Sequence, residues 1–182
     1  ISVFGAYFKL QSFVFMPVFG INNAVLAISA FNYGARKPER ITAVMRWGCC
    51  FSCTLMALGT AAFLLLPETL LNIFNPNEQM LAVGIPALRI LCIPFIPAGV
   101  SIIFNGVFQA LDRSLFSMFV SISRQLLVLI PAAYLLSLSG NIDAVWLSYP
   151  IAEVVSLLVS VTLMITLYRS KIRPLSQKPL EN

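Results

Sequence analysis

Five long apolar stretches, separated by short polar segments, dominate this sequence. They cover residues 10–32, 41–66, 80–111, 114–138 and 144–168. At about 1.5 Å per residue, a helix made from each stretch is long enough to cross about 30 Å of hydrocarbon. Helices buried in a soluble bundle would have polar outer faces, whereas these stretches are apolar on nearly all sides. The pattern therefore predicts an all-α membrane protein with five complete spans.

The low content of charged residues supports this prediction. Only 10% of the 182 residues are charged, whereas a soluble domain would carry about 25% to cover its surface. The net charge of +5 is compatible with a nucleic-acid partner. However, the basic residues lie in short runs between apolar stretches, which is typical of membrane topology. We therefore expect membrane lipids, and no nucleic acid, as partners.

The polar segments alternate in charge along the chain. Residues 67–79 and 139–143 contain no Lys or Arg. Because successive spans alternate sides, nine basic residues fall on one side of the membrane, and outside the spans only Lys9 falls on the other. The nine are Arg36, Lys37, Arg40, Arg46, Arg113, Arg169, Lys171, Arg173 and Lys178. The positive-inside rule then predicts a multi-pass protein of the cell membrane with a cytoplasmic C-terminus.

The two ends of the chain carry further expectations. The apolar run 1–8 is too short to cross a bilayer, so we expect it to be the end of a sixth helix that is largely missing. Residues 1–168 would then form one helical lobe. We expect residues 169–182 to be a short, disordered, basic tail on the cytoplasmic side, attracted to anionic lipid headgroups.

No residue pattern typical of an enzyme appears in the sequence. There is no His, which removes the commonest general base and metal ligand. The Cys50-x-x-Cys53 spacing invites a redox or zinc interpretation, but no second cysteine pair follows. We interpret all four cysteines as small residues that pack within the membrane. The sequence thus predicts no enzyme activity, metal site or cofactor, with Na⁺ or H⁺ as candidate coupling ions.

Charged residues at membrane depth are the most informative candidates, because they are costly there and face a protein interior or a wet cavity. Glu153 lies about ten residues into the fifth stretch. It is placed to bind a proton, Na⁺ or a cationic substrate, or to serve as the buried partner of an arginine. Arg124 would pair with Glu153 if the fourth and fifth helices touch. We expect structural roles for Arg124 and for Arg89, which is near enough to the interface to snorkel.

Uncharged polar residues give four further candidates. Asn105 and Gln109 are spaced i, i+4 and share one face of the third helix. They would line a cavity or join two helices by hydrogen bonds. Asn22 and Asn23 follow Pro17 in the first helix, where a bend would shape a cavity. These four residues, with Glu153, are the candidate cavity or substrate- and ion-binding residues.

Several short motifs, in order, resemble the multidrug and toxin extrusion (MATE) family. FMPVFGINNA at 15–24 and NYGARKPER at 32–40 are similar to a Pro-x-x-Gly helix of that family and the turn that follows it. LRI at 88–90 with Pro97 and Gly99 resembles the family's tenth helix. The eleventh and twelfth helices are similar to SRQ at 123–125 with Pro131, and to WLSYP at 146–150 with Glu153.

The resemblance implies twelve helices in two six-helix lobes around a central cavity. This chain would be the C-terminal lobe, with five complete transmembrane helices plus the end of a sixth, and its partner would be the missing N-terminal lobe. The implied function is Na⁺- or H⁺-coupled multidrug efflux of small organic cations by alternating access. In some branches the coupling acid lies on helix ten, but no acid occurs between Arg89 and Leu111. We therefore expect the main coupling carboxylate in the missing residues.

Two alternatives remain open from the sequence. One is a lipid-linked saccharide flippase of the same superfamily, which would use a larger and more cationic cavity, and the intramembrane arginines are compatible with it. The other is a membrane subunit that transports nothing. Its intramembrane polar groups would only join helices.

Overall fold

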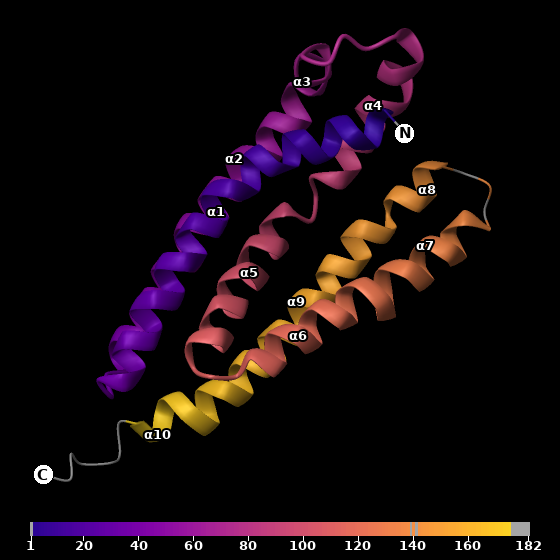
Figure 1. The fold of residues 1–182 in the computed structure, drawn as a ribbon. Coiled ribbons are helices and arrows are strands. Elements are labelled where there is room, and N and C mark those ends of the chain that lie inside the picture. The colour runs from indigo at the N-terminus through magenta and orange to yellow at the C-terminus, as the bar shows by residue number, and fades with distance from the viewer. Residues whose placement is uncertain (1, 139, 141, 176–182) are drawn as a thin grey trace, which may run out of the picture.

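The computed structural model describes residues 2–138, 140 and 142–175, and all of its elements are helices (Figure 1). Four helices are long and apolar enough to cross a membrane, and a bent pair raises the number to five. The architecture therefore agrees with the predicted all-α chain. Residues 176–182 of the predicted tail, with Lys178, lie outside the described residues.

The first two helices form a long antiparallel pair. Helix α1 covers Ser2–Gly34 and α2 covers Pro38–Leu65. Residues 2–8 are the first turns of α1, so our expectation of a separate sixth helix in this run is wrong. The helix continues through Lys9 despite its charge. The Lys9 ammonium lies 5.8 Å from the centre of the Phe74 ring. The cation is thereby accommodated beside an aromatic face.

The third apolar stretch is broken rather than continuous. After the short helix α3 (Pro67–Asn72), α4 covers Glu78–Leu91 and α5 covers Phe95–Ala110, and the two are bent by 49°. We expected one prolonged helix over 80–111, and this expectation is wrong. Pro94 and Pro97 provide the reason, because neither has an amide hydrogen to continue the ladder of backbone hydrogen bonds.

A threonine on α2 bridges to this break. The Thr60 hydroxyl lies 2.9 Å from the Met56 carbonyl oxygen and 3.3 Å from the Cys92 carbonyl oxygen, which sits at the end of α4. Replacing Thr60 with Val should lower the free energy of unfolding by about 0.6 kcal/mol, typical of a hydrogen bond between membrane helices. Thermal unfolding in detergent measures this change. Thr54→Val is the control, because the Thr54 hydroxyl bonds only within its own helix; equal losses would contradict the bridge.

The last two spans are also segmented. The fourth consists of α6 (Ser114–Ile122), a π-helical segment η1 (Ser123–Leu129) and α7 (Ile130–Ser137). The fifth consists of α8 (Ile142–Trp146) and α9 (Ser148–Leu167), followed by the π-helical segment η2 (Tyr168–Ile172) and α10 (Arg173–Leu175). Our expectation of a disordered tail from residue 169 is therefore wrong for residues 169–175. Helix continues to Leu175 because Ile172 is buried in the core, with 1% of its surface exposed.

The connections gather at two opposite ends of the bundle. Figure 1 shows the α1–α2 turn, the α5–α6 turn and the C-terminal helical segment together at one end. We call this the basic end and define it by residues 35–46, 111–113 and 168–175. Helix α3, the end of α7 and the start of α8 lie at the other end. When successive spans alternate in direction, the basic segments predicted for one side must lie at the same end, as they do here.

Candidate functional site

A cavity of about 580 Å³ opens between α1, α5, α6–η1 and α9. Its walls bring together side chains from parts of the chain that are far apart in sequence. Most of its polar residues come from α5, α6 and η1, whereas α1 contributes the apolar side chains of Phe15, Met16 and Phe19. Both polar and apolar groups therefore face the same space, as is usual for ligand sites.

An ion pair lies on the wall formed by η1 and α9. The Arg124 guanidinium donates a hydrogen bond to Glu153 Oε1 over 3.0 Å, so the expected contact between these residues is present. Arg124 is carried by the π-helical segment, and such segments are frequent at functional sites. The Glu153 side chain is 16% exposed, and its second oxygen, Oε2, is buried without a hydrogen-bond partner among the described residues. One carboxylate oxygen is thus already used, and the other is free to accept.

A polar stripe on α5 forms a second wall. Ser101, Asn105 and Gln109 are spaced by four residues, so they share one helix face, and all three line the cavity. Ser101 Oγ and Asn105 Oδ1 are buried without a partner in the described chain. Gln109 Nε2 lies 3.4 Å from Ser117 Oγ on α6, which joins the two walls. Buried polar atoms without partners are costly, which indicates a site built for a ligand or for water.

The structure brings together three of the five candidate residues and separates the other two. Asn105, Gln109 and Glu153 line the cavity with Arg124. Asn22 instead packs between α1 and α5, where its side-chain oxygen contacts Gly106. Asn23 is exposed on α1, outside the cavity.

Arg89 also lies away from this site. It is exposed near the end of α4, and it is absent from the cavity walls. Of the two intramembrane arginines considered from the sequence, only Arg124 therefore contributes charge to the cavity.

Ser101 on α5 and four other polar lining residues were not among the sequence candidates. Gln11 and Ser12 come from α1, and Ser117 and Ser121 come from α6. Ser117 and Ser121 have the i, i+4 spacing of one helix face, and the Ser121 hydroxyl donates to the Ser117 carbonyl oxygen over 3.0 Å. That spacing was the available signal, but single serines are common in membrane helices, where they bond to their own backbone.

The arrangement suits a cation that carries an apolar body. Glu153 Oε2 and Asn105 Oδ1 offer acceptor oxygens, while aromatic rings and a thioether offer soft apolar contact. Within the described residues, no group of three His, Cys, Asp or Glu side chains is placed to hold a metal ion.

Comparison with known proteins places this fold among transporters. The MatE family model matches residues 1–135 of the chain. A FAD transporter of Shewanella oneidensis is 24% identical over 153 residues, which are 84% of this chain and 34% of that protein. The probable multidrug resistance protein YoeA of Bacillus subtilis is 24% identical over 160 residues, which are 87% of this chain and 35% of that protein.

A solved structure agrees with these relatives. The MATE multidrug transporter DinF-BH has a TM-score of 0.82 and 31% identity to this chain, over 93% of this chain and 38% of that one. The chain thus spans about a third of the length of the curated relatives that it matches.

Proposed function

Because the chain belongs to the MatE family of membrane transporters, we propose that it forms most of the C-terminal lobe of a cation-coupled multidrug exporter. Members of this family are transporters rather than enzymes, and the chain is a multi-pass membrane segment of such a protein. The order of the motifs at 15–24, 32–40 and 146–150 supports the assignment to the C-terminal lobe. The basic residues gathered at the end that carries Leu175 support a cytoplasmic C-terminus.

The free carboxylate oxygen of Glu153 is the observation that carries this proposal. A small organic cation in the cavity would bind to Oε2, while Oε1 stays bonded to Arg124. Phe15 and Phe19 would contact the apolar part of the ligand. Na⁺ or H⁺ would drive the exchange from the main coupling carboxylate, which we expect outside residues 1–182, so Glu153 would serve ligand binding.

Alternating access would use the breaks in the helices. The 49° bend between α4 and α5 and the π-helical segment η1 both border the cavity-forming helices. Such discontinuities allow parts of a lobe to rock while the site stays in place. The opposing N-terminal lobe would close the cavity on the side where Met16 and Phe19 are exposed.

One observation favours a second candidate function, the export of an anionic dinucleotide. Arg124 faces the cavity and is 36% exposed, so a phosphate group has access to its guanidinium. The relative from Shewanella oneidensis is named as a FAD transporter. In this mode Arg124, rather than Glu153, would be the main binding residue.

An export assay with the full-length protein separates the two candidates. In inside-out vesicles, we expect uptake of a fluorescent organic cation driven by an imposed Na⁺ or proton gradient, and no competition by FAD. Collapsing both gradients should abolish the uptake. Uptake that persists without either gradient would contradict cation coupling, and uptake of FAD in place of the cation would favour the second candidate.

A further inference from the structure

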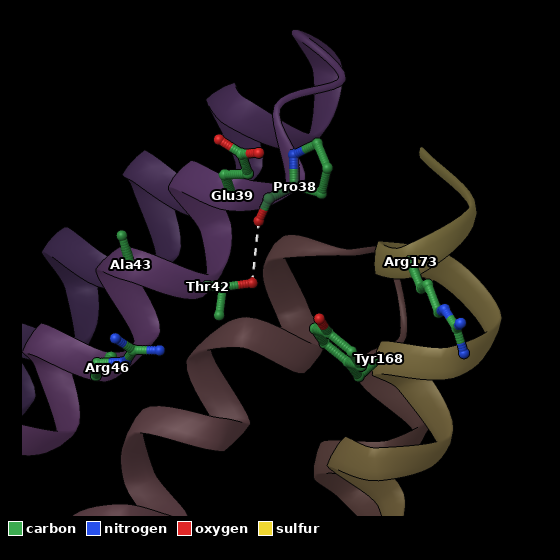
Figure 2. Close-up of a pocket in the computed structure, with 7 residues that line it drawn as sticks. All are labelled: Pro38, Glu39, Thr42, Ala43, Arg46, Tyr168 and Arg173. Atoms are coloured by element: carbon green, nitrogen blue, oxygen red, sulfur yellow. Dashed lines mark hydrogen bonds between the residues drawn. The ribbon is translucent and has the colours of Figure 1, made fainter. Parts of the chain in front are cut away.

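A second cavity, separate from the transport site, lies at the basic end. It measures about 420 Å³ and is formed by the first turns of α2 and by η2–α10 (Figure 2). The two segments share a hydrophobic core. Ile41 of α2 and Leu167 and Ile172 of the C-terminal segment belong to one buried cluster. The cavity is therefore a built feature of the packed chain.

The cavity is lined by positive charge and by hydrogen-bond donors. Arg46 comes from α2, and Tyr168 and Arg173 come from the C-terminal segment. In Figure 2 the Arg46 guanidinium and the Tyr168 hydroxyl point toward the space between the two segments, whereas the Glu39 carboxylate points away from it. The Thr42 hydroxyl donates to the Pro38 carbonyl oxygen over 3.0 Å, so its own proton is already used.

Further positive charge surrounds this cavity. An adjoining cavity on the other side of Pro38 and Glu39 is lined by Arg36, Lys37 and Arg40. With Arg46 and Arg173, the two cavities present five cations and one carboxylate, so the local potential favours an anion. Arginine side chains match the geometry of phosphate oxygens, which they bind in pairs of hydrogen bonds.

The position along α2 places this charge at the level of lipid headgroups. Trp47 follows Arg46 directly and is 62% exposed, and its ring stacks on that of Phe51, which is 57% exposed. Exposed tryptophan is enriched at the boundary between hydrocarbon and water. A ligand bound at Arg46 would therefore be in reach of the membrane surface, with acyl chains lying along the apolar face of α2.

We propose that this cavity binds the phosphate group of an anionic membrane lipid. The phosphate would lie between Arg46 and Tyr168, and the Arg173 guanidinium, which points outward in Figure 2, would turn toward it from the C-terminal segment. Basic pockets between membrane helices are known binding places for such headgroups. This binding does not depend on which substrate the transporter carries.

Native mass spectrometry of the full-length protein tests the proposal. The protein is released from micelles that contain phosphatidylglycerol and phosphatidylcholine in equal amounts. We expect retained phosphatidylglycerol in excess, and a loss of that excess by roughly fivefold for Arg46→Gln or Arg173→Gln and by about 30-fold for both. Arg169→Gln is the matched control, because Arg169 lies on η2 between the lining residues but does not line the cavity.

The other outcomes would overturn the proposal. Equal retention of the two lipids would show that no anionic headgroup is selected. An equal loss in Arg169→Gln would assign the effect to the general charge of this end. Bound inorganic phosphate that displaces lipid at millimolar concentration, without any preference between the lipids, would make the site one for a free anion. Size-exclusion chromatography of each variant confirms that it is folded.

Discussion

Replacing Glu153 with Gln is expected to weaken the binding of an organic cation to the full-length transporter about 10- to 150-fold, because a hydrogen bond to a charged group contributes about 1.5–3 kcal/mol. The substitution removes the charge from the buried Oε2 atom, which has no partner in the described chain. The glutamine oxygen still accepts from Arg124, so the contact between η1 and α9 is retained. Fluorescence anisotropy of a bound cationic dye measures the change.

Arg124 separates the two candidate functions in the same assay. If the cavity binds cations, Arg124→Met should leave cation binding unchanged or tighten it, because the competing guanidinium is gone. If the cavity binds an anionic dinucleotide, the same variant should lose the binding of FAD. Arg89→Met is the control, since Arg89 is an exposed arginine outside the cavity.

Two results would contradict the role given to Glu153. One is unchanged cation affinity in Glu153→Gln, which would leave the carboxylate as a structural partner of Arg124 only. The other is an equal loss in Glu78→Gln, whose carboxyl group is exposed at the start of α4, outside the cavity. In the double variant Glu153→Gln with Arg124→Met, no charge is left unpaired, so correct folding there assigns any loss of binding to the site.

The sequence predicted the helices well because lipid imposes one simple rule on them. A helix that spans the membrane forms all its backbone hydrogen bonds internally, and it must be long and apolar. Both properties can be read directly along the chain. The cost of charge in hydrocarbon likewise indicated the pairing of Arg124 with Glu153 before any neighbouring helices were known.

Features that depend on neighbouring helices could not be predicted in this way. Asn22 and Asn105 are both asparagines within apolar stretches, but Asn22 packs against Gly106 whereas Asn105 lines the cavity. The break after Leu91 was also hidden, because proline occurs in continuous membrane helices too, as Pro17 does in α1. Whether a proline breaks its helix depends on the neighbouring helices, and Thr60 of α2 reaches the Cys92 carbonyl oxygen beside the break only in the folded chain.

Close packing of α1, α2 and α5 leads to the second large expected effect. A side chain added at Gly48 would place its Cβ 2.6 Å from Val25 Cγ2 and 3.3 Å from Ile103 Cγ2. The Val25 side chain is stiff about its first torsion, so it cannot move aside easily. Gly48→Leu should therefore separate α2 from both neighbours and lower the free energy of unfolding by about 1–3 kcal/mol, the usual cost of overpacking.

Gly20→Leu provides the matched control for this effect. Gly20 lies in α1, and no atom is within 4 Å of a Cβ added there. Replacing glycine in a helix gains up to about 1 kcal/mol of helix propensity, so this variant should be as stable as the parent or slightly more stable. Cys49, Cys50 and Cys53, which are not fully buried, are first replaced with Ser in all the proteins compared. Unfolding is then followed by the reaction of a thiol-specific dye with Cys92, which is fully buried in the folded chain. Gly48→Leu should expose Cys92 at a lower temperature than the parent. If Gly48→Leu and Gly20→Leu unfold at the same temperature, steric contact at Gly48 does not set the packing of these three helices.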